Sequence, residues 1–261
     1  MVAGFIDKIP LWGVLFTTIF VVWVAIETGF WSGFKLGRKP GFDNETQIAS
    51  ITGAHLALLA FMLAFTFSQA ASHNNDRKIV ILDEANAIET AYLRTYLISE
   101  PRGKNIRALL REYTALRAAA GDADKAAQIL SESTTLQNQI WNESEALADD
   151  NQFTVKHSLL VQAINELFDL HEQRVFAGVR NRIPKTIWAA LYAILLLSMI
   201  GMGFHAGIKG SRSPIPSAAL ALSFSLVLFL IADLDRSRSG VIRADQSNII
   251  ELKQRLEQAQ D

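Results

Sequence analysis

The chain has 261 residues, of which 50% are hydrophobic and only 20% are charged. A formal net charge of −1 at pH 7 gives the chain no overall bias toward nucleic acid or anionic lipid, and the absence of cysteine excludes disulfides, thiol catalysis and cysteine-ligated metal sites. The apolar residues gather in blocks, which is typical of membrane-spanning segments rather than of one large soluble core.

Four apolar blocks are long enough to cross the hydrocarbon core of a bilayer, which takes about 20 residues. These blocks are residues 10–31, 51–71, 187–208 and 215–232. Residues 32–49, between the first two, are rich in Gly and polar residues and predict a loop. Four crossings place both termini and the long middle region on the same side. Lys and Arg residues beside the spans are more numerous on that side, which predicts that it is cytoplasmic.

The middle region is polar but keeps a helical period, with apolar residues three or four positions apart. Turn-forming residues divide it into helices expected at residues 73–99, 103–120, 123–148 and 153–181. The first of these should continue the second span without a break. No stretch alternates like a strand, so we expect an all-α protein. A last amphipathic helix, expected at residues 246–259, should pack on the bundle or on a neighbouring subunit.

These elements predict an integral membrane protein with four transmembrane helices and a cytoplasmic helical bundle inserted between the second and the third. The expected parts are the first two transmembrane helices, the cytoplasmic helical domain, the last two transmembrane helices and a cytoplasmic tail with an amphipathic helix. In chain order they occupy residues 1–72, 73–183, 184–233 and 234–261.

The second span carries one polar stripe, whose members recur every three or four residues and therefore share a helix face. They are Thr52, His55, Leu59, Met62, Thr66, Gln69 and His73. His and Gln are costly in hydrocarbon, so this face should meet protein or water. Two interpretations stay open: a pore lined by several copies, and hydrogen bonding that packs helices together. Phe61 and Phe65 lie beside the stripe, where a ring could constrict a pore by dewetting, although packing is the simpler account of both.

The helix that follows contains a dense polar motif, LDEANAIETAYLR, at residues 82–94. Its small Ala residues invite close packing on either side. This favours an inter-helix network of Glu84, Asn86 and Arg94, within or across subunits, over a solvated charged face. A catalytic carboxylate pair would need a nucleophile or a phosphate-binding loop, and neither accompanies the motif, so we expect no enzyme.

A third group of charges lies where the fourth span leaves the membrane. Asp233 and Asp235 could form an acidic ring that attracts cations or a divalent-cation site, but a salt bridge to Arg77, Arg180 or Arg182 is the simpler interpretation. Arg236 could meet anionic lipid headgroups. None of the five His has metal-ligand spacing, so no metal site and no cofactor is expected.

Four segments of the chain carry specific patterns: LLAFMLAFTFSQA in the second span, RKIVILDEANAIETAYLR after it, LLREYTALR at residues 109–117 and IADLDRSRSG at residues 231–240. Together they resemble the bestrophin-like domain family of bacterial membrane proteins. Glu89 stands where the family pattern has Gly, and Ser237 where it has Pro.

The wider similarity is to true bestrophins, which are pentameric ion channels with four spans per subunit and a hydrophobic neck along the second. It implies the same use here for the stripe and for Phe61 and Phe65. The chain lacks the acidic cluster that forms the calcium clasp of animal bestrophins, so calcium gating is not implied.

We therefore expect a homo-oligomer, a pentamer by analogy, that conducts inorganic ions along its second span in the bacterial inner membrane. Its partners are then the lipid bilayer, further copies of itself and the ions, without nucleic acid. The alternative is a non-conducting scaffold or sensor, in which the long second helix couples the bilayer to the cytoplasmic bundle.

Overall fold

The computed structural model describes residues 10–39, 45–121, 125–147, 154–212, 214–236, 240–242 and 244–259. Within these ranges all regular structure is helical, which confirms the predicted all-α class. The chain divides into two compact units. The first holds the described residues up to Ser72, with Arg182–Arg236 and Gly240–Ile242, and the second holds His73–Asn181 and the described residues after Ile242.

Four helical stretches are long and apolar enough to cross a membrane, as the hydropathy of the sequence predicts. They are α1 (Leu11–Gly37), α2 (Glu45–Thr95), α6 (Lys185–Lys209), which is the apolar part of a longer helical stretch, and α7 (Pro214–Asp235). Helix α2 has 51 residues, so the second span does continue without a break into the following helix.

Prolines and a glycine mark the ends of the last two spans. Pro184 directly precedes α6 and Pro214 is the first residue of α7, positions where the missing N–H and the fixed φ of proline suit a helix start. Helix α6 ends at Gly210, whose φ of 62° is the left-handed conformation that glycine adopts without strain.

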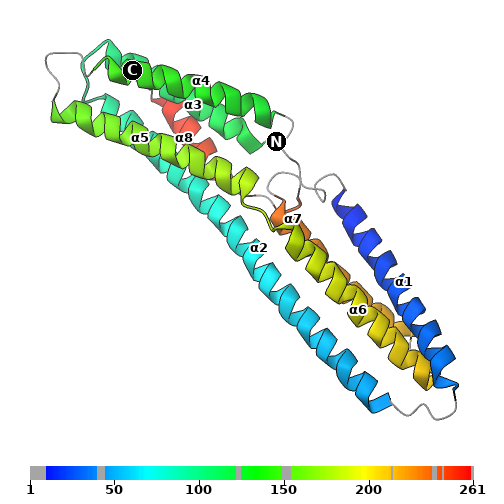
Figure 1. Ribbon diagram of the computed structural model, residues 1–261. Helices are drawn as coiled ribbons and strands as arrows, with labels where there is room; N and C mark the ends of the chain where they lie inside the picture. Colours follow the sequence, from blue (N-terminus) through cyan, green and yellow to red (C-terminus); the bar gives the residue numbers. More distant parts are fainter. Residues whose placement is uncertain are drawn as a thin grey trace. The chain divides into compact units, whose positions relative to one another are not determined.

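Within the first unit, α1 runs alongside α6 (Figure 1). The two helices pack backbone to backbone through glycines of both. A Cβ atom at Gly29 would overlap the carbonyl oxygen of Ile200, and one at Gly203 would overlap the carbonyl oxygen of Ile26. Gly33 and Gly207 extend the same contact by one turn. Small residues at this spacing allow the close approach on which helix association in membranes depends.

This contact corrects the loop predicted at residues 32–49. Helix α1 continues to Gly37. Gly33 and Gly37 lie on the side of α1 that packs against α6, where they allow close packing and do not end the helix. Helix α2 already begins at Glu45, and residues 40–44 of the predicted loop lie outside the described residues.

The second unit is a bundle of the later part of α2 with α3 (Arg102–Ala118), α4 (Ala126–Glu145), α5 (Val155–Val175) and α8 (Ser247–Gln258). Short 3-10 and π-helical turns follow α3 and α5, at Ala119–Gly121 and Phe176–Arg180. Positions 123, 124, 148 and 153 of the predicted helices are not among the described residues.

The core of this bundle is formed by residues at the predicted helical period, among them Ile88, Ile106, Leu110, Ile140 and Leu167. Helix α8 contributes the buried side chains of its apolar side to the same core. The last amphipathic helix therefore packs on the bundle of its own chain.

Candidate functional site

The polar stripe of the second span faces inward, onto α6, in the first unit. Thr52, Leu59 and Thr66 are buried, and His55, Met62 and Gln69 are half-buried. The Ser198 hydroxyl of α6 donates a hydrogen bond of 3.2 Å to the carbonyl oxygen of His55. The Thr52 side chain lies close to Gly201, where a Cβ atom would be 3.3 Å from its hydroxyl, tighter than an ordinary contact. His73, the last member of the stripe, is half-buried in the second unit.

The stripe also uses hydrogen bonds within its own helix. The Thr66 hydroxyl donates to the carbonyl oxygen of Met62 over 2.8 Å, which satisfies the hydroxyl without a second helix or water. Within the chain, the stripe therefore contacts α6 and bonds partly to its own helix.

A different face of α2 is left open in the first unit. Phe61 and Phe65 have exposed fractions of 67% and 60%. Exposed residues recur at every third or fourth position around them, and this column, which we call the open face, comprises Ile51, Ala54, Leu58, Phe61, Phe65, Ser68 and Ser72. The adjoining side of the helix is exposed as well, at Gly53, Ala57, Ala60, Ala64 and Phe67. At 3.6 residues per turn this open face lies about a third of a turn from the stripe. Of the predicted pore-lining residues, only Phe65 belongs to it.

In the second unit, Glu84 of α2 has no exposed surface and is held by two arginines from other helices. The Nε of Arg117 on α3 donates to its carboxylate over 2.7 Å, and the guanidinium of Arg174 on α5 donates to the other carboxylate oxygen. Tyr113 of α3 donates its hydroxyl over 3.2 Å. One carboxylate thus ties three helices of the bundle together.

His171 of α5 completes this cluster, which we call the Glu84 network. Its Nδ1 lies 2.9 Å from the Tyr113 hydroxyl oxygen. A neutral imidazole ring with its proton on Nδ1 would donate a hydrogen bond to the Tyr113 hydroxyl, which in turn donates to Glu84. Each of these two protons then has an acceptor.

Burial and the neighbouring charges set the protonation of the network. Burial on its own would raise the pKa of Glu84, but the guanidinium groups of Arg174 and Arg117 outweigh it and hold the pKa below the ordinary 4.5. Burial, helped by Arg117, lowers the pKa of His171 to about 4. Burial, helped by the Glu84 carboxylate, raises the pKa of Tyr113. At neutral pH the glutamate is therefore charged, and the histidine and the tyrosine are neutral.

The predicted network of Glu84, Asn86 and Arg94 is not the one that forms within the chain. Asn86 is exposed, and Arg94 donates a hydrogen bond of 2.5 Å to the carbonyl oxygen of Leu159 on α5. The reason is geometric, because residues two positions apart on a helix do not share a face. The partners of Glu84 come instead from core positions of α3 and α5. Arg117 follows the buried Tyr113 by four residues, and this basic residue in a core register is the signal that could have revealed the network.

The acidic residues at the end of α7 point into the first unit. Asp233 is 1% exposed, and its carboxylate accepts the N–H groups of Val241 at 2.6 Å and Ile242 at 3.1 Å. A Cβ atom at Gly240 would collide with this carboxylate, which explains a glycine at that position. Asp233 thus fixes the backbone of the segment that follows α7.

Asp235 likewise fixes the backbone just before α6. Its carboxylate accepts the N–H of Ile183 at 2.9 Å and lies 3.8 Å from the guanidinium of Arg182, which agrees with the simpler, salt-bridged interpretation. Arg236 is also buried. Among the described residues no cluster of three or more His, Asp or Glu could hold a metal ion.

Comparison with known proteins identifies a family that this sequence matches. The sequence model of the bestrophin-like domain matches residues 20–249. A sequence search of curated proteins finds no match.

Similar folds occur among solved structures. A crystal structure described as that of a membrane protein has a TM-score of 0.61 at 14% identity, covering 95% of this chain and 97% of its own. Two crystal structures of a bacterial bestrophin homologue from Klebsiella pneumoniae both have a TM-score of 0.59. The first is 15% identical and covers 94% of this chain and 97% of its own; the second is 13% identical and covers 95% and 99%. At these identities the likeness is one of fold. Because the family match itself extends over most of the chain, this protein belongs to the bestrophin-like domain family.

Proposed function

We propose that the chain is one subunit of a homo-oligomeric ion channel whose conduction path runs along α2. Membership of the bestrophin-like domain family supports this proposal, because true bestrophins are pentameric channels with a hydrophobic neck on the second span. A pentamer is accordingly the assembly that we propose.

The observation that carries the proposal is the open face of α2. It combines small residues, Ala54, Ser68 and Ser72, with the rings of Phe61 and Phe65. Small residues leave room for copies of the helix to approach a common axis. Several copies of the two rings would then form a narrow hydrophobic constriction, which gates by excluding water. The path therefore lies on this face, and the stripe beside it packs on α6.

The proposed orientation places the bundle of the second unit and both ends of the chain in the cytoplasm of a bacterium. Lys and Arg residues beside the spans are more numerous on that side. The inner membrane is then the site of the protein.

One observation favours a second function, a non-conducting scaffold or sensor. Two polar groups of the stripe, the Thr66 hydroxyl and the backbone carbonyl of His55, are hydrogen-bonded within the chain, so these two groups do not need a water-filled path. In this alternative the open face of α2 binds other helices, and the continuous helix links the bilayer to the bundle.

The absence of cysteine allows a direct test in planar bilayers, because single cysteines need no altered background. Ser68→Cys and Thr66→Cys differ by two positions, and the first side chain is exposed whereas the second is buried. A charged, water-soluble thiol reagent should block the current of S68C and leave that of T66C unchanged. Phe65→Ala should raise the conductance.

Folded wild-type protein that passes no current with any anion or cation, across pH, would overturn the channel and favour the scaffold. Current that is blocked in T66C but not in S68C would keep the channel and reject the proposed face.

A further inference from the structure

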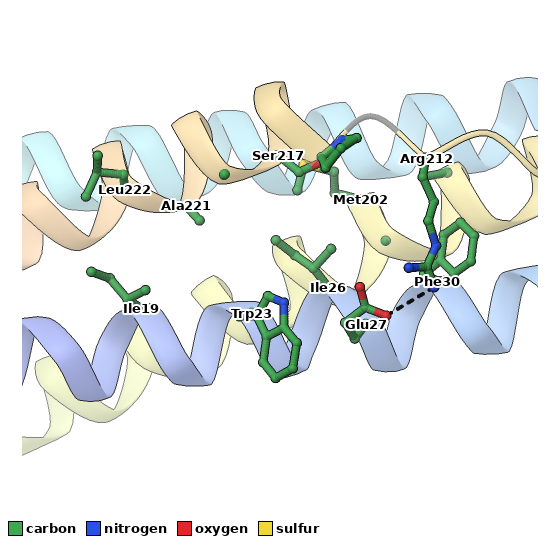
Figure 2. A pocket seen from close by; sticks show the side chains of 14 residues that line it. Ile19, Trp23, Ile26, Glu27, Phe30, Met202, Arg212, Ser217, Ala221 and Leu222 are labelled. Atoms are coloured by element: carbon green, nitrogen blue, oxygen red, sulfur yellow. Dashed lines mark hydrogen bonds and ion pairs between the residues drawn. The ribbon is translucent and has the colours of Figure 1, made fainter.

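The first unit contains an apolar cavity of about 360 Å³ that lies between α1, α6 and α7 and is partly open to the surface. Ile19, Ile26, Met202, Ala221 and Leu222 are among the side chains that line it. Figure 2 shows Ile19 and Leu222 at one end of the cavity and the charged side chains of Glu27 and Arg212 at the other.

The charged end of the cavity carries one positive and one negative side chain. The guanidinium of Arg212 lies 3.4 Å from the Glu27 carboxylate, and both side chains keep access to solvent, with exposed fractions of 51% and 34%. The ring of Phe30 lies 4.3 Å below the Arg212 guanidinium and holds it over the end of the cavity. A negative and a positive group therefore face outward side by side.

The position along the spans places these charges at the membrane surface. Arg212 follows the end of α6, and the exposed Trp31 lies one turn beyond Glu27 on α1, at a depth where aromatic side chains mark the interface. From Glu27 to Ile19 the cavity follows α1 for eight residues, or about 12 Å. One leaflet is half of a hydrocarbon core of about 30 Å, so the cavity has the depth of a single acyl chain.

We propose that this cavity holds one acyl chain of a phosphatidylethanolamine molecule whose headgroup binds the Glu27–Arg212 pair. The ammonium group would donate hydrogen bonds to Glu27, and the phosphate would accept them from Arg212, both of them charge-assisted. The occupant is an amine-bearing zwitterionic lipid, because phosphatidylglycerol would set its phosphate beside Glu27 without an ammonium to meet that carboxylate.

Lipid retention by the full-length oligomer in detergent tests this proposal. The protein is incubated with equal amounts of phosphatidylethanolamine and phosphatidylglycerol of the same chains, washed, and analysed for bound lipid by mass spectrometry. We expect the wild type to prefer phosphatidylethanolamine about tenfold, the ratio that one extra charge-assisted hydrogen bond supplies. Ala218→Trp fills the cavity from its exposed rim and should abolish retention, whereas Ala219→Trp, on the neighbouring exposed position outside the cavity, should not.

The double variant Glu27→Gln with Arg212→Gln should retain lipid but lose the preference between the two headgroups. Equal retention by the two tryptophan variants would overturn the proposal, as would a wild type that prefers neither lipid. A change in the mass of the oligomer with A218W alone would also overturn it, because the cavity would then be covered by a second copy of the chain. If A218W does not fold, the double variant decides, and an unchanged headgroup preference refutes the site.

Discussion

Glu84→Gln removes the charge from the Glu84 network while it keeps the size of the side chain. In the wild type the carboxylate is completely buried, and the Arg117 side chain beside it is 4% exposed. The substitution leaves two guanidinium groups in the bundle without the carboxylate that both of them bind. Removing one partner from a buried ion pair costs about 3–5 kcal/mol, because the remaining charge is not compensated.

Glu89 supplies a matched control five positions further along the same helix. It also pairs with an arginine, Arg255, at 2.8 Å, but the side chains are 34% and 60% exposed. Solvent screens such a pair, so Glu89→Gln should cost only about 0–1 kcal/mol. Because the two variants make the same chemical change in α2, their difference isolates the effect of burial.

Thermal unfolding of the full-length protein in one detergent, at one protein concentration and pH 7, measures this difference. A loss of 1 kcal/mol lowers the melting temperature of a chain of this size by about 2–4 °C. We therefore expect E84Q to melt about 6–20 °C below the wild type, and E89Q at most about 4 °C below it. Equal shifts for the two variants would refute the reasoning.

The difference in melting temperature between the wild type and E84Q should also depend on pH in a definite direction. The pKa of Glu84 is lower in the folded state than its ordinary value of 4.5, so the unfolded chain takes up the proton first as the pH falls. The stability that the charged carboxylate contributes is complete above that value and is lost below it. The gap in melting temperature between the wild type and E84Q should therefore narrow below pH 4.5. A gap of constant size down to pH 3 would contradict an electrostatic origin.

Further variants test other contacts by the same melting measurement. The folded pKa of His171, about 4, lies below its ordinary 6.5, so the wild type should lose stability as the pH falls between these values, and His171→Gln should flatten that slope. Gly29→Ala forces a methyl group onto the backbone of α6 and should cost about 1–3 kcal/mol, whereas Gly53→Ala, with no atom within 4 Å of the new Cβ, should be neutral or stabilise by up to about 1 kcal/mol. Asp233→Asn weakens the charge-assisted bonds to the segment after α7 and should cost about 1.5–3 kcal/mol.

The all-helical class and the four spans could be predicted because their signals are local in the sequence. An apolar block of about 20 residues has to cross the bilayer whatever it packs against. The same locality explains why α2 could be recognised as one helix, since the sequence from Gly53 to Thr95 contains no proline and no further glycine.

The contacts between helices could not be predicted in this way, because they depend on residues that are distant in the sequence. Gly33 and Gly37 indicate a loop when they are considered alone, and only the backbone of Phe204 and Ile208 on α6 gives them a role in packing. The stripe was similarly ambiguous. The residues of the stripe themselves indicate that it avoids lipid. Whether it faces water or protein depends on a distant residue, Ser198 of α6, which bonds to the carbonyl oxygen of His55.

The two faces of α2 have a consequence for how the proposed channel would work. From Ile51 to Ser72 the sequence contains no Asp, Glu, Lys or Arg, so the open face cannot present a ring of charges to an ion. Rings of charged side chains or of backbone carbonyls confer ion selectivity, whereas hydrophobic rings control the entry of water. The helical carbonyls of α2 bond within the helix and are not free to replace a hydration shell. Phe61 and Phe65 would therefore act as a gate, and any selectivity of the channel would arise outside the α2 span.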